Sequence, residues 1–315
     1  MYMIELLPVF KDYLWGGNKL RTHYKKDSTL EIVAESWELS THPDGESIIK
    51  NTGQTLSDYI KEKGNQVLGT KCKVNDIPIL IKLIDAKQSL SIQVHPDDEY
   101  AKAIENDFGK TEMWYILEAE EGAQLVYGFN KDLTKEEFEN NIKNNTLTNV
   151  MNYVPVKQGD VFFIKAGTLH AIGEGILIAE IQQRSNVTYR VYDFGRKDSN
   201  GNTRELHVDK SLDVTKLNKA TNEKVKYNWQ PITGGKYSTL VDCQYFNTAI
   251  ININDAITRD VTSESFEAII SLSDGLIISD AVNKIHLYKG DTIFIPANSG
   301  EYKVEGKGQI LVTHL

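Results

Sequence analysis

A short motif that occurs twice is the sequence feature that most constrains the fold of this chain. Residues 159–170 read GDVFFIKAGTLH, and residues 290–301 read GDTIFIPANSGE. Each copy begins with Gly-Asp, continues through an apolar stretch to a Lys-Ala or Pro-Ala turn, and ends with an imidazole or a carboxyl side chain. A repeated turn–strand–turn unit indicates that two similar β units follow each other along the chain.

Most of the remaining sequence is typical of short β-strands. Segments rich in Ile, Val, Leu, Phe and Tyr are separated by Gly, Asn, Asp or Pro. This pattern predicts a mainly β protein with an antiparallel sandwich or barrel architecture. The predicted strands cover residues 77–86, 90–95, 113–117, 160–164, 175–181 and 238–251.

Three helices are predicted to interrupt the strands. One follows Thr55 and ends near Gly64, and a second covers about residues 97–106. The third begins at Thr134, because Glu137 completes a capping box with that threonine. We expect all three helices to be insertions in a β scaffold that carry no catalytic residues.

The net charge of the chain indicates which partners it is unsuited to bind. The sequence has 35 Lys and Arg residues against 44 Asp and Glu residues, a formal net charge of −9. Nucleic acids and anionic membranes both favour clusters of Lys and Arg, so we expect neither as a partner. A phosphorylated small molecule remains compatible with this charge, because it needs only a few basic groups in one cleft.

The cysteines and the N-terminal residues indicate a cytoplasmic protein. Cys72 and Cys243 are too far apart in the sequence for a metal motif, and two cysteines cannot make a disulfide framework. The chain does not begin like a signal peptide, and no segment approaches the roughly 20 apolar residues of a membrane helix. We expect a monomer or a weak homo-oligomer in a reducing compartment.

Polar side chains at three places on the predicted strands can meet at one metal ion. Gln93 and His95 share one face of a strand, because side chains alternate along it. Lys110 and Glu112 share a face in the same way, and His170 ends the first copy of the repeat. Gln93, His95, Glu112 and His170 would supply an amide oxygen, two imidazoles and a carboxylate. This donor set suits zinc, tolerates iron or manganese, and leaves one or two positions for water or substrate.

A structural role is the alternative for each of these side chains. A lone histidine on a strand is more often a hydrogen-bonded part of the scaffold than a ligand, and we assign that role by default to His23, His42, His207, His286 and His314. Lys82 is different, because it lies within the apolar segment 79–84, where a lysine without a partner is costly to bury. This position favours a functional role for Lys82.

Several motifs resemble those of the type I mannose-6-phosphate isomerases, in the short bacterial branch of that family. The resemblance runs in order from about residue 8 to residue 210. The motifs are Trp15-Gly16, Ala34-Glu35-Ser36-Trp37, SIQVHPD at 91–97, KTE at 110–112, AGTLHA at 166–171 and NVTYR at 186–190.

The repeated motif is similar to the second conserved motif of cupins, in which a glycine is followed at fixed spacing by a proline and a histidine. The first copy keeps the histidine, His170, and the second has Glu301 in its place. The resemblance therefore implies two cupin-type jelly-roll barrels with a few inserted helices, of which only the first keeps its metal ligand. We expect a catalytic domain over residues 1–234 and a degenerate cupin domain over residues 235–315.

The family resemblance also implies a function. It implies an isomerase that interconverts D-mannose 6-phosphate and D-fructose 6-phosphate, with one zinc ion per chain held by the four ligands predicted above. It further implies that Arg190 is an active-site arginine, that Lys82 and Lys110 face the substrate, and that Glu180 is an acidic residue of the pocket. Arg196 stands where the family often has a lysine, and could assist Arg190 with the phosphate.

Two departures from the family pattern leave the acid–base group open. Gly109 stands where longer members have a histidine, and Ile172 stands where they commonly have a tyrosine. The segment Arg204-Glu205-Leu206-His207 is a local candidate to replace these groups. The candidates for proton transfer are Lys110, Lys82, Glu180 and His207. The first alternative function is a metal-binding cupin that senses or binds a phosphorylated sugar without turnover. A metal-dependent dioxygenase is the second, and the glutamine ligand and the arginine motif count against it.

Overall fold

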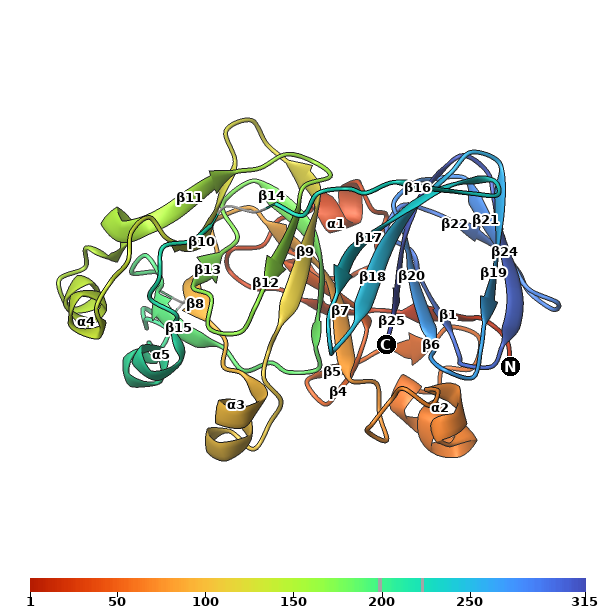
Figure 1. Cartoon of the computed structure of the whole chain (residues 1–315), viewed down its shortest axis with the longest axis horizontal. Coiled ribbons are helices and arrows are strands. Elements are labelled where there is room, and N and C mark those ends of the chain that lie inside the picture. Colours follow the sequence, from red (N-terminus) through yellow and green to blue (C-terminus); the bar gives the residue numbers. More distant parts are fainter. Residues whose placement is uncertain (198–199, 222–223) are drawn as a thin grey trace.

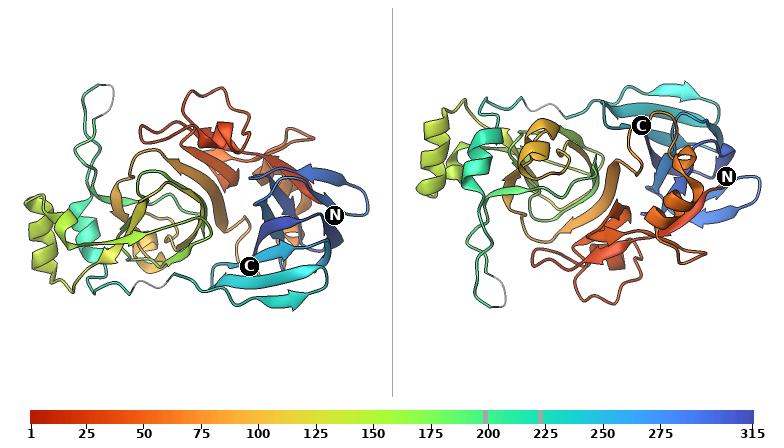
Figure 2. Two further views of the ribbon diagram at one scale, coloured as in Figure 1. Left: turned by 90° about the horizontal axis from the view of Figure 1, so that it is seen from above. Right: turned by 90° about the horizontal axis from the view of Figure 1, so that it is seen from below.

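The computed structural model of the chain is mainly β and forms two barrels side by side, which confirms the predicted fold class (Figure 1). The structure describes residues 1–197, 200–221 and 224–315. Seen from above and from below, each barrel is a separate ring of strands, and both ends of the chain lie in the second barrel (Figure 2).

The first barrel has two sheets that face each other across an apolar interior. The six-stranded sheet contains, in spatial order, β12 (Val161–Ile164), β9 (Glu112–Ala119), β14 (Ile176–Gln183), β7 (Ile79–Ala86), β3 (Glu35–Leu39) and β2 (Val9–Lys11). The five-stranded sheet contains β11 (Met151–Pro155), β10 (Gln124–Phe129), β13 (His170–Ala171), β8 (Ile92–Val94) and β15 (Tyr189–Tyr192). A small separate hairpin is formed by β4 (Thr41–His42) and β5 (Gly45–Glu46).

The second barrel includes strands from the start of the chain. Its eight-stranded sheet contains β16 (Gln230–Ile232), β17 (Gly235–Asp242), β18 (Asn247–Ile253), β25 (Gly308–His314), β20 (Glu267–Ser271), β23 (Thr292–Ile295), β1 (Ile4–Leu7) and β6 (Ile48–Ile49). Its four-stranded sheet contains β19 (Ala256–Val261), β24 (Gly300–Glu305), β21 (Leu276–Ser279) and β22 (Lys284–Leu287). The division into residues 1–234 and 235–315 stays a prediction from the sequence, and in space β1 and β6 belong to the second barrel.

The strands between the two barrels are covered on both faces. Every residue of β7 and β14 is buried. Ile178 of β14 points into the first barrel and packs with Trp114, whereas Leu177 and Ile181 belong to the apolar cluster that contains Phe266 of the second barrel. This double cover explains why these strands are nearly continuous apolar runs, and why a charged residue within them needs a partner.

The repeated motif forms the same structure twice. Gly159 and Gly290 start the two copies with φ angles of 87° and 90°, a region that favours glycine. The next strand, β12 or β23, pairs in each copy with a strand that begins with a glutamate, which is Glu112 in β9 and Glu267 in β20. The two glutamates therefore occupy equivalent positions in the two barrels.

A charged cluster surrounds Glu267 inside the second barrel. Arg259 of β19 forms an ion pair with Glu267, and the buried hydroxyl of Tyr302 donates to Glu267 Oε2 at 2.6 Å. The sequence predicted Glu301 at the position of His170, but Glu301 is exposed and Tyr302 of β24 is buried in the barrel instead. The inward residue comes one position later in the second copy, and a shift of one residue reverses the faces of a strand.

The three predicted helices are present. Thr55 caps α2 (Leu56–Lys63), Asp97 caps α3 (Asp98–Ile104), and Thr134 with Glu137 forms the capping box of α4 (Lys135–Lys143). The helices α3, α4 and α5 contribute residues to the apolar cluster on the outer face of the five-stranded sheet (Figure 1). None of the helices in the described ranges is long and apolar enough to cross a membrane. The sequence did not predict α1 (Lys19–Thr22), α5 (Val208–Val214), or the 3₁₀ helices η1 (Asn65–Val67) and η2 (Leu147–Val150).

One predicted strand is wrong. The segment 238–251 is not a single strand but lies within a hairpin of β17 and β18. The backbone N–H of Cys243 donates to the carbonyl of Phe246 at 3.1 Å and closes the turn. The turn contains neither glycine nor proline, so no strong turn signal marks it in the sequence.

Candidate metal centre and substrate cavity

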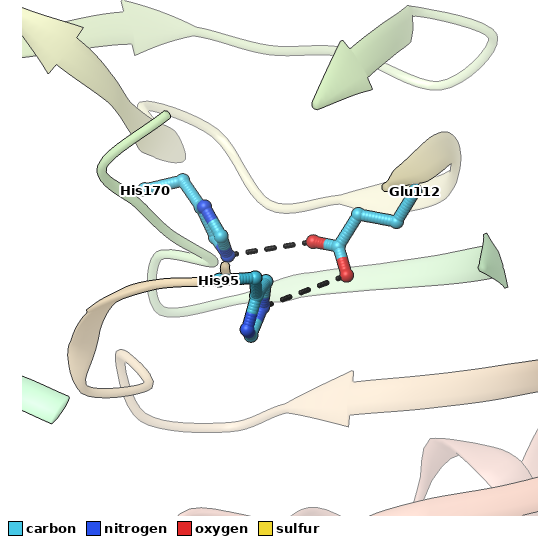
Figure 3. A group of neighbouring side chains, drawn as sticks. All are labelled: His95, Glu112 and His170. Atoms are coloured by element: carbon cyan, nitrogen blue, oxygen red, sulfur yellow. Dashed lines mark ion pairs between the residues drawn. The ribbon is translucent and has the colours of Figure 1, made fainter. Parts of the chain in front are cut away.

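Three side chains from both sheets converge inside the first barrel (Figure 3). Glu112 is the first residue of β9 and His170 the first residue of β13, while His95 directly follows β8. His95 Nε2 lies 3.7 Å from Glu112 Oε2, and His170 Nε2 lies 3.4 Å from Glu112 Oε1. All three residues are at most 1% exposed.

Backbone carbonyls orient both imidazole rings. The Nδ1 atom of His95 lies 2.8 Å from the carbonyl oxygen of Val187, and Nδ1 of His170 lies 2.8 Å from that of Thr168. Because a carbonyl only accepts, each Nδ1 must carry the proton. The lone pair of each Nε2 is therefore directed at Glu112, as in a metal-binding histidine.

The buried ligand atoms fit a divalent cation. Among the described residues, Nε2 of both histidines and Oε1 of Glu112 have no hydrogen-bond partner, although buried polar groups almost always have one. The ligand atoms of the three residues all lie within 4.8 Å of one another. Neighbouring ligands of a tetrahedral zinc ion are roughly 3.4 Å apart, close to the separations observed here.

The electrostatics of the cluster also fit a cation. Burial lowers the pKa of His170 to about 4 and holds the pKa of His95 well below its usual value, so both rings are neutral. Burial, and then the nearby carboxylate of Glu180, raise the pKa of Glu112 to about 8. Metal binding requires neutral imidazoles, which burial favours here. A bound cation would also stabilise the ionised form of the buried Glu112 carboxylate.

Gln93 is adjacent to this cluster. It pairs with His170 across the ladder between β8 and β13, and the hydroxyl of Ser91 donates to its Oε1 atom at 3.4 Å. Gln93 also lines the neighbouring cavity. Its role as the fourth ligand stays a prediction.

A cavity of about 270 Å³ lies beside the cluster, because Lys110 lines it and is 3.2 Å from Glu112, and it is also lined by the other residues predicted to act on the substrate. Lys82, Lys110, Glu180 and Arg190 all line it. These residues come from β7, the segment before β9, β14 and β15, so the two sheets bring together four separate parts of the sequence. Their roles in catalysis stay predictions.

Lys82 has the partners that its buried position requires. Its Nζ atom lies 3.6 Å from Glu35 Oε2 and 3.9 Å from Glu180 Oε1. It also lies 4.6 Å from the centre of the buried Trp37 ring, whose π face attracts the ammonium group. Lys82 is thus a buried cation in the cavity wall.

Lys110 connects the cavity to the metal cluster, and Glu180 lies beside it. Lys110 Nζ lies 3.2 Å from Glu112 and 3.9 Å from Glu180. Burial alone would lower the pKa of Lys110, but the two carboxylates outweigh it and raise the pKa. Glu180 accepts a hydrogen bond from Trp114 Nε1 on its Oε2 atom, whereas its Oε1 atom has no hydrogen-bond partner in the described part of the chain.

Arg190 and His207 have different roles from each other. Arg190 is half-buried in the cavity wall, and its Nη1 atom donates to the carbonyl of Glu205 at 2.9 Å. His207 Nδ1 accepts from the backbone N–H of Arg190, and the His207 N–H donates to the Arg190 carbonyl. Within the described residues, His207 does not line the cavity. It supports the strand of Arg190 instead.

Two further charged residues line the cavity: Glu35, for which no role was predicted from the sequence, and Arg204, which was named only as part of the segment 204–207. Glu35 accepts a hydrogen bond from Trp37 Nε1 at 2.7 Å and lies beside Lys82. The signal that could have identified Glu35 is a carboxylate within the motif Ala34-Glu35-Ser36-Trp37, which served above only as a mark of the family. Arg204 lies in a loop and carried no comparable signal.

The glycine that departs from the family pattern has a structural explanation. A Cβ atom at Gly109 would lie 2.5 Å from backbone atoms of Asp97 and Asp98, at the start of α3. Gly109 also donates its backbone N–H to Asp98 Oδ1 at 2.8 Å. A histidine cannot occupy this position unless the start of α3 moves.

The fold and the cluster together define the class of this protein. Two similar β-barrels, of which the first holds two imidazoles and a carboxylate beside a cavity rich in charged groups, are the features of a metal-binding cupin.

Comparisons with known proteins identify the family. Residues 3–126 match the catalytic domain of type I phosphomannose isomerase, and residues 236–315 match the cupin domain of mannose-6-phosphate isomerase. The mannose-6-phosphate isomerase of Streptococcus mutans is 36% identical over 304 residues, which are 96% of this chain and 94% of that protein. The chain belongs to the type I mannose-6-phosphate isomerase family, as its motifs predicted.

Solved structures agree with this assignment. The mannose 6-phosphate isomerase from Bacillus subtilis superposes with a TM-score of 0.92 at 32% identity, over 100% of both chains. A mannose 6-phosphate isomerase bound with zinc and yttrium superposes with a TM-score of 0.81 at 15% identity, over 100% of this chain and 99% of that one. The second likeness concerns the fold alone.

Proposed function

We propose that this chain interconverts D-mannose 6-phosphate and D-fructose 6-phosphate. The observation that carries the proposal is the buried cluster of His95, Glu112 and His170 at a cavity lined by cationic and acidic groups. Membership of the isomerase family over nearly the whole chain supports it. The substrate class is a small sugar phosphate.

We assign one zinc ion per chain to Gln93, His95, Glu112 and His170, and Fe²⁺ or Mn²⁺ suits the same donors. When bound, such an ion supplies Lewis-acid polarisation of the sugar oxygens. The orphaned Nε2 and Oε1 atoms of the cluster support the assignment.

The residues of the cavity provide the acid–base chemistry. Isomerisation removes a proton from carbon 2 of the aldose and delivers one to carbon 1. Glu180 Oε1 lies 3.9 Å from both Lys82 Nζ and Lys110 Nζ and has no hydrogen bond of its own among the described residues, so we assign the proton transfer to Glu180. A positioned acid–base group contributes about 100- to 10,000-fold in rate. Lys82 and Lys110 then donate hydrogen bonds to the sugar oxygens and hold the substrate in place.

Arg190 is suited to the phosphate group. Its guanidinium is half-buried, and its Nε atom has no hydrogen-bond partner within the described ranges. A planar guanidinium matches two oxygens of a phosphate, which a lysine cannot do.

A coupled assay tests the proposal. The purified protein, loaded with zinc, should convert fructose 6-phosphate to mannose 6-phosphate, and Glu180→Gln should lower kcat by at least about 100-fold with the zinc retained. A protein that only senses the sugar would be stabilised against heat by fructose 6-phosphate and would form no product. That outcome would refute the isomerase and favour the binding protein.

We further propose a cytoplasmic protein that is a monomer or a weak homo-oligomer. Cys72 and Cys243 are the only cysteines of the sequence, and both are free thiols, which suits a reducing compartment. The acidic net charge of −9 supports the expectation that neither nucleic acid nor a membrane is a partner.

A further inference from the structure

Among the described residues, the cavity wall has more cationic than anionic side chains. Each lysine faces carboxylates in the cavity or the metal cluster, since Lys82 lies near Glu35 and Glu180 and Lys110 lies near Glu112 and Glu180. Within the described part of the chain, Arg190 and Arg204 of the wall have no carboxylate partner that lines the cavity, and the partner of Arg204, Asp193, lies outside the lining. The surplus positive charge of the cavity is therefore located at the arginines.

Arg204 is held in place from behind by Asp193. Its Nε and Nη2 atoms donate to the two oxygens of Asp193 at 2.7 and 2.6 Å. Asp193 is 6% exposed and does not belong to the cavity wall as described, whereas the Arg204 side chain is 35% exposed. The pairing uses one edge of the guanidinium and leaves the Nη1 amino group outside it. A fixed fork of this kind loses little freedom when it binds an anion.

Arg190 and Arg204 are close enough to affect each other. Burial lowers the pKa of Arg190 first, and Arg204 lowers it more than any other neighbouring charge. Asp193 offsets part of this repulsion, since it raises the pKa of Arg190, and an anion bound in the cavity between the two guanidinium groups would offset more. Arg190 Nε is also a buried donor for which the described residues provide no acceptor. Both observations indicate a site for an anionic group.

Arg196 does not provide this site. It donates through Nη2 to Asp193 Oδ1 at 2.7 Å, and its guanidinium lies 5.4 Å from the centre of the Phe194 ring. It is absent from the cavity wall in the part of the chain that the structure describes. The Nε and Nη1 atoms of Arg196 also lack hydrogen-bond partners among the described residues, but Arg196 contacts Asp193 and does not line the cavity.

We propose that Arg204, held by Asp193, binds the phosphate group of the substrate together with Arg190 and selects phosphorylated over unphosphorylated sugars. The proposal rests on the proposed isomerase function and names a specificity-determining residue for it. Asp193 is a positioning residue, because it acts through Arg204.

Steady-state kinetics of Arg204→Ala and Arg204→Lys test the proposal. A charge-assisted hydrogen bond to the phosphate predicts that Arg204→Ala raises KM for mannose 6-phosphate by about 10- to 100-fold, with kcat within a few-fold of the parent. Arg204→Lys should recover part of the loss, because it keeps the charge and loses the fork. Arg184→Ala is the matched control, since Arg184 forms a comparable pair with Asp76 at 2.8 Å outside the cavity. It should leave KM unchanged.

Inorganic phosphate separates this proposal from the proposed function. Phosphate should inhibit the parent competitively and raise its melting temperature, and both effects should weaken by about 10-fold or more in Arg204→Ala. Asp193→Asn should weaken phosphate binding in the parent and add little in the Arg204→Ala background, because the two residues act as one unit.

Each outcome has one consequence. An unchanged KM and unchanged phosphate inhibition in a folded Arg204→Ala enzyme would overturn the role of Arg204 and leave the isomerase intact. A parent protein that binds phosphate through Arg204 but converts no sugar phosphate would overturn the isomerase and support the anion site. If Arg204→Ala melts far below the parent, the Arg204→Lys variant replaces it as the test of the proposal. A KM and a phosphate affinity equal to those of the parent in Arg204→Lys would then count against the role of Arg204.

Discussion

At the scale of single residues, the metal centre depends on groups that are unfavourable without a cation. Glu112 is fully buried, and burial and Glu180 raise its pKa to about 8. The two histidines direct lone pairs at it, and these lone pairs have no other partner in the described structure. Lys110 lies 3.2 Å from this carboxylate, and a bound divalent cation would accept both lone pairs and stabilise the cluster further.

Removing either imidazole should therefore abolish metal binding and activity together. His95→Ala or His170→Ala leaves two of the three clustered donors and should reduce the zinc content per chain to near zero, measured by elemental analysis alongside the isomerase assay. Arg190→Ala is the matched control and should depress turnover of the sugar phosphate while the zinc is retained. Full activity in either histidine variant would refute the ligand assignment.

Gly109 tests why this chain lacks the histidine of longer relatives. Gly109→Ala places a Cβ atom 2.5 Å from the backbone at the start of α3, and overpacking of this kind costs about 2 kcal/mol in the free energy of unfolding. Gly45→Ala is the milder comparison, because its Cβ would meet side-chain atoms at 3.1 Å or more. Denaturant unfolding that ranks the two variants in the opposite order would contradict this explanation.

The convergence of His95, Glu112 and His170 could be predicted because local rules place these side chains, whereas the role of Gln93 as a ligand stays a prediction. Alternation along a strand puts Gln93 and His95 on one face, and the repeat identifies His170. The pairing of Arg204 with Asp193 could not be predicted, because a loop carries Arg204 to the cavity and the path of a loop depends on the packing around it. The role of His207 was left open for the same reason, since its contact with Arg190 joins two segments that follow no common pattern.

At the scale of elements, capping signals predicted α2, α3 and α4 but not α1 or α5, and the hairpin turn was missed. Thr134 and Glu137 form the capping box that the sequence indicates. The turn between β17 and β18 was missed because Cys243 and Phe246 are not turn-forming residues, and the apolar pattern continues through them.

The equivalent strands of the two barrels also lead to a test. Arg259→Met leaves the buried carboxylate of Glu267 without its cation, and breaking one half of such a pair costs about 3 kcal/mol in the free energy of unfolding. Glu267→Met in the same chain should recover much of that loss, because an apolar pair replaces the ion pair. Denaturant unfolding of the two single variants and the double variant measures this cycle. A single Arg259→Met variant as stable as the parent would contradict it.

At the scale of the whole molecule, the two barrels are not independent units. Strand β1 at the start of the chain pairs with β23 of the second barrel, and β6 pairs with β1. The apolar cluster between the barrels joins Leu177 and Ile181 of the first to Phe266 of the second. No pattern in the sequence indicated that the first residues complete the last sheet, because strand pairing over such a separation is decided by tertiary packing.

The C-terminal segment should consequently not fold alone. A fragment of residues 235–315 lacks β1 and β6 and exposes the apolar face that the first barrel covers. Circular dichroism and denaturant titration should show no cooperative unfolding of this fragment, while the full chain unfolds cooperatively. A sharp transition of the isolated fragment would indicate that the boundary at residue 235 separates autonomous domains.

The second barrel carries its positive charge on a side chain of its own. Glu267 occupies the position equivalent to Glu112, and Arg259 forms an ion pair with it. The guanidinium of Arg259 therefore neutralises Glu267, whereas a dissociable metal ion would neutralise Glu112 in the first barrel. A chelator can withdraw an ion but not an arginine. Removal of the metal should therefore abolish the activity, while the ion pair inside the second barrel is unaffected. The second barrel should stay folded and continue to pack against the first barrel until metal binds again.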